Sequence, residues 1–255
     1  MRRAKKARNL AAFLVLLESC FLFSPAALAE KIAEWRIEQK QYLSGDHVIY
    51  VTPGAIKIIN KTIGYEVISK APDWHVYAFR PDDKVICVVS RPAFYKDQEF
   101  QPVAVGLANR KLTRVGTQSI GGKRVDVFQS GLDEVWIGHF SGVKRPIEDL
   151  IVAYYRLDSI DGFLMKASTN GENIQEKGAS FLSTEYKGRV NIVETLRITA
   201  VPFNSHDFDL PAEFKKASSF EQIMTSSQRR KHAESIMMEL DVGERLGKKK
   251  VESGN

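Results

Sequence analysis

Short runs of β-branched and aromatic residues, separated by turn residues, fill the stretch from residue 47 to residue 90. Runs of this kind are typical of consecutive antiparallel hairpins. The breaks between them hold turn formers such as Pro53-Gly54 and Pro81-Asp82-Asp83. The pattern predicts five strands: His47–Thr52, Ala55–Asn60, Gly64–Ser69, Trp74–Phe79 and Lys84–Ser90.

Two of these strands carry apolar or aromatic residues on both faces. An antiparallel sheet with one face in water alternates apolar and polar residues. The runs Trp74-His75-Val76-Tyr77-Ala78-Phe79 and Val85-Ile86-Cys87-Val88-Val89 do not alternate in this way. Apolar material must therefore cover both sides of the sheet, and the candidates are a helix, a second sheet or a bound hydrophobic ligand.

The rest of the chain predicts more strands and few helices. A helix is expected from about Pro146 to Leu157, because Pro146 suits a first turn and the apolar residues that follow share one side. The segment Ala33–Leu43 is open between helix and strand. Further strands are predicted over Arg124–Gln129, Glu134–Phe140, Phe163–Ser168, Ala179–Tyr186 and Asn191–Val201.

This order of elements predicts a mainly β (α+β) fold. We expect an unclosed antiparallel β-barrel whose concave face is covered or plugged by helices. The expected organisation is a leader over residues 1–29, one half-barrel domain over 30–218, and a C-terminal extension over 219–255. The extension is helix-like from Ser219 to Leu246 and ends in a disordered basic tail.

The first 29 residues have the pattern of a cleavable secretory signal peptide. Five basic residues precede the apolar run from Leu10 to Phe23, and Ala27 and Ala29 fit the A-x-A cleavage rule. We therefore expect a mature protein that begins at Glu30 and works in the periplasm or is secreted. Lipidation of Cys20 and a retained anchor are the alternatives.

Charge and cysteine content narrow the classes of partner. The formal net charge is +6, but much of the excess lies in the leader, so the mature chain is nearly neutral. This argues against non-specific nucleic-acid binding.

Outside the leader Cys87 is the one cysteine, which excludes an intramolecular disulfide. Basic clusters at residues 229–232 and 248–250 indicate a solvated helix face and a frayed end, and a weak contact with anionic lipid head groups is the alternative.

Motifs for catalysis or cofactor binding do not occur. The sequence has no nucleophile elbow, P-loop, dinucleotide fingerprint or paired-histidine metal motif. Its histidines are scattered singly, which predicts no metal site. We expect no cofactor and no catalytic residues, and therefore a non-enzymatic protein, with a secreted hydrolase as the third hypothesis because catalytic carboxylates can meet in space alone.

Three stretches of sequence resemble the LolA-like periplasmic lipoprotein carriers and their uncharacterised secreted relatives. They are "HVIYVTPGAIKIINKTIGYEVISKAPDWHVYAFRPDDKV", "SIGGKRVDVFQS" and "HDFDLPAEFKK", which together span much of Tyr42–Lys216. The resemblance implies an unclosed antiparallel barrel with a helix-lidded hydrophobic cavity that takes acyl chains. Val51-Thr52-Pro53 lacks the basic residues that often precede this proline, and Lys70-Ala71-Pro72-Asp73 lacks the usual Asp-Gly.

The leading hypothesis is an envelope protein that binds a lipid or lipidated ligand in an apolar cavity, as outer-membrane lipoprotein carriers do. Its partner is then an acyl chain, with a transient membrane or protein partner besides, and we expect a monomer. The alternative is a protein-interaction or sensor module with a filled interior. The predicted cavity residues are one alternating set, although a one-residue shift would exchange the faces: Tyr50, Ile56, Ile58, Val67, Trp74, Val76 and Ala78.

Overall fold

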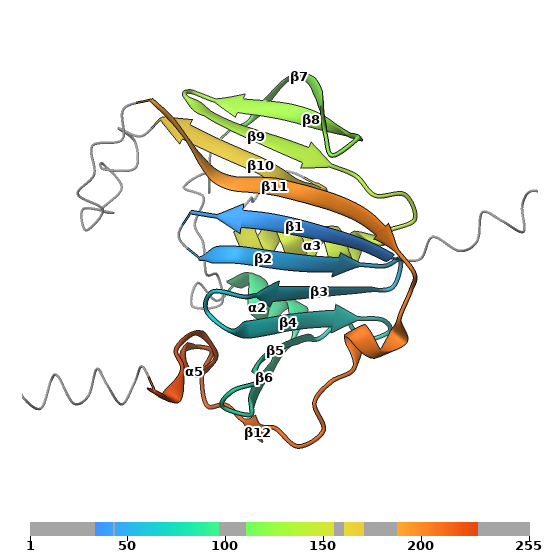
Figure 1. Ribbon diagram of the computed structural model, residues 1–255, viewed down its shortest axis with the longest axis vertical. Coiled ribbons are helices and arrows are strands. Elements are labelled where there is room, and N and C mark those ends of the chain that lie inside the picture. Colours follow the sequence, from blue (N-terminus) through green and yellow to red (C-terminus); the bar gives the residue numbers. More distant parts are fainter. Residues whose placement is uncertain (1–33, 43, 97–110, 156–160, 171–187, 229–255) are drawn as a thin grey trace, which may run out of the picture.

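One twisted sheet dominates the fold (Figure 1). The computed structural model describes residues 34–42, 44–96, 111–155, 161–170 and 188–228. Its strands form one sheet in the order β12-β6-β5-β4-β3-β2-β1-β11-β10-β9-β8-β7. The bounds are β1 Glu34–Gln41, β2 Gly45–Val51, β3 Ala55–Asn60, β4 Tyr65–Lys70, β5 Val76–Arg80, β6 Val85–Val89, β7 Thr113–Ile120, β8 Lys123–Ser130, β9 Asp133–Gly138, β10 Phe163–Asn170, β11 Arg189–Val201 and β12 Lys215–Lys216.

Neighbouring strands are antiparallel with one exception. The two-residue strand β12 runs parallel to β6 at one edge, so the sheet is mixed. The strands from β2 to β6 follow one another as hairpins, and β7 to β10 form the other half. The strands β1 and β11 pair in the middle, where Gln41 lies opposite Val193. The predicted mainly β, unclosed architecture is therefore confirmed.

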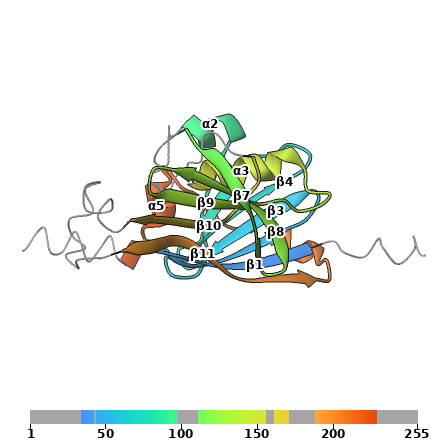
Figure 2. The same cartoon turned by 90° about the horizontal axis from the view of Figure 1, so that it is seen from above.

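Helices are few and short in the described part of the chain. They are α2 Arg91–Lys96, α3 Arg145–Tyr155, the 3₁₀ helix η3 Ser205–Phe208 and α5 Glu221–Met224. Figure 2 shows α2 and α3 on the same side of the curved sheet. We call the face that α3 covers the inner face. No helix among the described residues is both long and apolar enough to cross a membrane.

The inner face is apolar along its centre because the strand register places one residue from each strand in a row. Ile37 lies opposite Ile49, Ile49 opposite Ile58, Ile58 opposite Val67, and Val67 opposite Ala78. Each of these side chains is at most 2% exposed. Residues of α3 belong to the same hydrophobic core, so helix and sheet share one interior.

The open choice for Ala33–Leu43 is settled as a strand, β1, whose burial pattern alternates. Four elements were not predicted: β7, β12, α2 and η3. The strand β7 is exposed or half-buried at every position, so it has no apolar alternation that a sequence could display. The predicted signal peptide, Cys20, and the predicted strand Ala179–Tyr186 lie outside the described residues.

The start of the C-terminal extension packs on the sheet. Phe220 and Ile223 are at most 1% exposed, and the Phe220 ring meets Tyr65 edge-on with ring centroids 6.4 Å apart. The predicted boundary at residue 218 therefore does not separate the extension from the core. The helix α5 is four residues long and ends at Met224, and residues 229–246 of the predicted helix-like run lie outside the described residues.

Buried Arg80 holds this segment. Its side chain donates hydrogen bonds to the carbonyl oxygens of Ile223 (2.9 Å), Met224 (2.9 Å) and Ile63 (2.7 Å). A guanidinium ion needs such partners when it leaves water, since an unpaired buried charge is costly. Asp83 adds a second tie, because its carboxylate accepts from the backbone N–H and the hydroxyl of Ser227.

Candidate functional site

Five of the seven predicted cavity residues lie together on the inner face. On neighbouring strands, Ile56 lies opposite a residue of β4, Ile58 lies opposite Val67, and Val67 lies opposite Ala78. All five side chains are at most 2% exposed and belong to the main hydrophobic core. They are Ile56, Ile58, Val67, Val76 and Ala78.

The other two predicted residues lie elsewhere. Tyr50 is paired with Lys57 and with Arg36, out of phase with Ile49, so it lies on the outer face of the sheet. Trp74 comes just before β5 and has a backbone φ of 55°. Its half-buried side chain packs against the core. The predicted set therefore does not form one surface, and Tyr50 is removed from it.

The helix α3 fills the space that the sequence assigned to a cavity. Six of its eleven residues are buried, including Ile147, Leu150, Tyr154 and Tyr155. Its buried residues belong to the same hydrophobic core as the row of isoleucines and valines on the sheet. The inner face is thus covered by protein at the five predicted positions, as in the filled-interior alternative.

Buried polar groups tie α3 to the sheet. The Tyr154 hydroxyl lies 2.6 Å from the Tyr65 hydroxyl and 3.1 Å from Nε2 of His47. The Nδ2 atom of Asn60 lies 2.9 Å from the same Nε2, and Nδ1 of His47 lies 3.1 Å from the Gly45 carbonyl oxygen. This geometry fits a neutral imidazole with its proton on Nδ1. Burial lowers the pKa of His47 to about 4.

A second buried contact joins the last residue of α3 to β1. The Tyr155 hydroxyl donates to the Gln39 side-chain oxygen (2.6 Å) and accepts from the Gln41 amide (2.6 Å). The Gln39 amide in turn donates to the Leu164 carbonyl oxygen (2.6 Å). Because these groups satisfy one another, they contribute order and do not present a free site.

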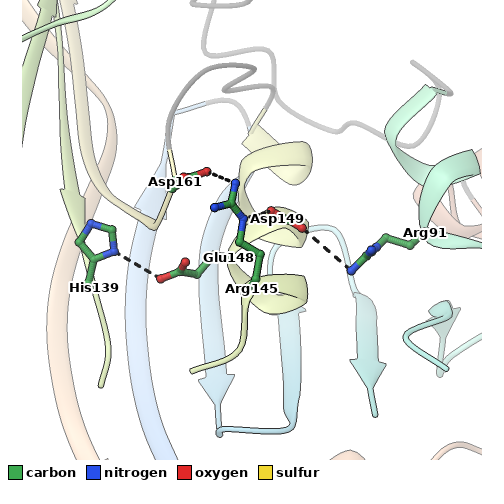
Figure 3. Close-up of polar contacts among 6 residues, drawn as sticks. All are labelled: Arg91, His139, Arg145, Glu148, Asp149 and Asp161. Atoms are coloured by element: carbon green, nitrogen blue, oxygen red, sulfur yellow. Dashed lines mark hydrogen bonds and ion pairs between the residues drawn. The ribbon is translucent and has the colours of Figure 1, made fainter. Parts of the chain in front are cut away.

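The solvent side of α3 carries ion pairs with its neighbours (Figure 3). Arg145 contacts Asp149 (3.2 Å) and Asp161 (2.6 Å), and Asp149 lies 4.0 Å from Arg91 of α2. His139 approaches Glu148 at 3.3 Å. Such exposed pairs contribute little individually. Their arrangement orients α3 between α2 and the turn before β10. Among the described residues, no group of three or more His, Cys, Asp or Glu side chains could hold a metal ion.

A pocket of about 480 Å³ opens at one end of the sheet. One wall is the β2–β3 turn, residues 52–55, together with Lys70 and Ala71 at the end of β4. The other wall is the segment 203–209, which leaves β11 and forms η3, drawn orange beside β4 in Figure 1. We call this segment the strap. The pocket volume lies within the range of about 300–1,000 Å³ that is usual for small-ligand pockets.

Hydrogen bonds and ring contacts fix the two walls. The Lys70 ammonium donates to the Phe208 carbonyl oxygen (2.9 Å), which joins β4 to the strap. The rings of Phe203 and Phe208 are stacked with centroids 6.4 Å apart. In the turn, the Thr52 hydroxyl accepts from the backbone N–H groups of Gly54 and Ala55. The pocket is therefore a built feature with mainly apolar walls.

The sequence hypothesis did not include these pocket residues. The strap overlaps the stretch "HDFDLPAEFKK", which the sequence marked only by its resemblance to LolA-like carriers. Phe203 is 53% exposed, and an exposed aromatic residue near Phe208 was the available signal. The sequence around Phe203 and Phe208 does not indicate a contact with Lys70, because only the fold brings these distant residues together.

Comparisons with known proteins give no family. No family model matches the chain, and no curated protein matches it. One similar solved structure is an uncharacterized conserved protein from Thermus thermophilus, with 6% identity and TM-score 0.38 over 73% of this chain and 90% of that chain. Another is MucB in complex with MucA(peri), with 8% identity and TM-score 0.28. There the match covers 76% of this chain and 59% of MucB.

Proposed function

We propose that the chain is a non-enzymatic protein of the bacterial envelope that binds a lipid or lipidated ligand, as carriers or sorting proteins for outer-membrane lipoproteins do. The acyl chain enters the pocket between the β2–β3 turn and the strap, not the space under α3. The observation that carries the proposal is the apolar pocket of about 480 Å³ with Phe203 and Phe208 in its wall. The leader pattern and the resemblance to LolA-like carriers support the envelope setting.

Such a site can bind an acyl chain without polar contacts to it, because burial of methylene groups supplies the binding free energy. Burial of a methylene group contributes about 0.8 kcal/mol, so eight methylenes contribute roughly 6 kcal/mol before the costs of association. In the β2–β3 turn, the backbone N–H groups of Gly54 and Ala55 already donate hydrogen bonds to the Thr52 hydroxyl. An acyl chain in contact with them therefore leaves no buried donor unpaired.

The experiment is a titration with a fluorescent fatty acid on a pair of glycine variants. A Cβ atom added at Gly54, which lines the pocket, or at Gly116 in β7 meets nothing within 4 Å. Gly54→Leu should weaken binding at least about tenfold by filling pocket volume, whereas Gly116→Leu should leave it unchanged. Equal affinity of both variants, or no binding by the wild type, would remove the pocket as the ligand site.

The filled inner face favours a second candidate, a protein-interaction or sensor module on the same fold. In that case α3 is permanent structure and the envelope protein purifies without lipid. A native mass spectrum separates the candidates. A mass excess that matches bound lipid, lost in Gly54→Leu, supports the carrier function, while a lipid-free spectrum supports the interaction module.

A further inference from the structure

Two opposite charges line the pocket without neutralising each other. Lys70 and Asp209 are the basic and the acidic residue of its wall. The Lys70 ammonium lies 2.9 Å from the Phe208 carbonyl oxygen, and Asp209 contacts Nδ1 of His206 at 2.9 Å. Within the described part of the chain these two residues form no ion pair with each other, although they belong to opposite walls, Lys70 to the end of β4 and Asp209 to the strap.

Each charged group has capacity left for a ligand. An ammonium group has three donors, and the Phe208 carbonyl takes one of those of Lys70. A carboxylate offers about four acceptor positions, and His206 uses one oxygen of Asp209. Asp209 is exposed and Lys70 is half-buried, so both lie where a head group at the mouth would meet them.

We propose that the pocket selects an amphiphile with a zwitterionic head group, of which phosphoethanolamine is the simplest lipid example. The phosphate lies against the Lys70 ammonium, the ligand's ammonium lies against the Asp209 carboxylate, and the acyl chain lies along Phe203 and Phe208. A purely anionic head would gain Lys70 but meet repulsion from Asp209. This inference rests on the proposed function and adds the class of lipid to it.

The test compares three single-chain lipids with the same acyl chain, each below its micelle-forming concentration. They are lysophosphatidylethanolamine, which is zwitterionic, lysophosphatidylglycerol, which is anionic, and the neutral monoacylglycerol. The wild type should bind the zwitterion about threefold to fivefold more tightly than either other lipid, because partly exposed ion pairs contribute modestly. Free O-phosphoethanolamine should not bind at the same concentrations.

Two variants assign the preference to its residues. Lys70→Met should weaken binding of both phospholipids and leave the monoacylglycerol unchanged. Asp209→Asn should weaken the zwitterion and strengthen the anionic lipid, so that the preference disappears. Lys61→Met and Asp82→Asn alter exposed charges outside the pocket wall and should change none of the three affinities.

The outcomes separate the inference from the function on which it rests. Equal wild-type affinity for all three lipids would overturn the head-group inference but keep the acyl site. Loss of all three affinities by the same factor in Lys70→Met would also overturn it, because that result indicates a loosened strap. Tight binding of free O-phosphoethanolamine would overturn it in favour of a soluble ligand. Absence of binding by all three lipids would overturn the proposed function itself.

Discussion

The Nε2 atom of His47 lies 3.1 Å from the hydroxyl oxygen of Tyr154, which joins β2 to α3 inside the core. The imidazole is 1% exposed and its pKa is about 4 in the folded protein. Protonation of Nε2 would remove the acceptor that Asn60 and Tyr154 use and would leave a buried charge. The attachment of α3 to the sheet therefore depends on a neutral His47.

Acid should weaken the fold through His47. The imidazole pKa is lowered from 6.5 to about 4 by burial, so between these values the unfolded chain binds more protons than the folded one. The free energy of unfolding therefore keeps its His47 contribution above pH 6.5 and loses up to about 3 kcal/mol as the pH falls toward 4. Urea unfolding between pH 7 and pH 4.5 measures the slope. His47→Gln should lose this part of the slope and His139→Gln should keep it; identical slopes in all three proteins would contradict the prediction.

Tyr154→Phe should destabilise the protein by about 1–3 kcal/mol, because the Tyr65 hydroxyl and His47 both lose a buried hydrogen-bond partner. The matched control is Tyr77→Phe, whose hydroxyl makes a long 3.3 Å bond to exposed Asp73 and should change stability by at most about 0.5 kcal/mol. Thermal unfolding of both variants checks the difference. Equal effects would mean that the buried network does not hold α3.

Truncation should distinguish the docked part of the C-terminal extension from the rest. Removal of residues 229–255 should leave the unfolding temperature unchanged in the described domain, because Phe220, Ile223 and the carbonyl partners of Arg80 remain. A chain that ends at Lys216 loses three buried side chains, those of Ala217, Phe220 and Ile223, and leaves Arg80 short of two partners, which should cost about 3 kcal/mol or more. Equal thermal stability of the two truncated proteins would show that α5 adds nothing.

Trp74→Glu should lower stability without moving ligand affinity. The side chain packs half-buried against the core, so a carboxylate there costs about 2 kcal/mol or more. The residue does not line the strap pocket, so fatty-acid binding by the folded protein should stay within about twofold. Leu132→Glu, at a site 58% exposed, is the control for both measurements. Loss of binding in folded Trp74→Glu would place the ligand against Trp74 and contradict the strap pocket as the whole binding site.

The strands with clear apolar alternation could be predicted from sequence, and β3 is the best case, since its predicted and observed bounds are both Ala55–Asn60. Hydrophobic periodicity is a local property, and here it decides the local structure. The strand β7 shows the converse. Both faces of β7 are largely exposed, so its sequence has no pattern of apolar residues that predicts a strand. The strand forms because it pairs with β8.

The error at Tyr50 has a specific cause. In β2 the inner positions are His47, Ile49 and Val51, and a polar inner residue disguises the phase of the strand. His47 is acceptable there only because Tyr154, far along the chain, supplies a partner. A sequence pattern cannot display a partner of that kind. The pocket was missed for the same reason, since its two walls come from residues 52–71 and 203–209.

The pairing of β1 with β11 at the centre of the sheet has a consequence for the order of folding. The hairpins from β2 to β6 need only neighbouring residues, whereas the central seam needs residues 189–201 to have left the ribosome. Contacts of such long sequence separation slow folding, because loop-closure entropy is lost before they form. Until the seam closes, the nascent chain holds two half-sheets with open edges, which are the surfaces a chaperone would have to shield.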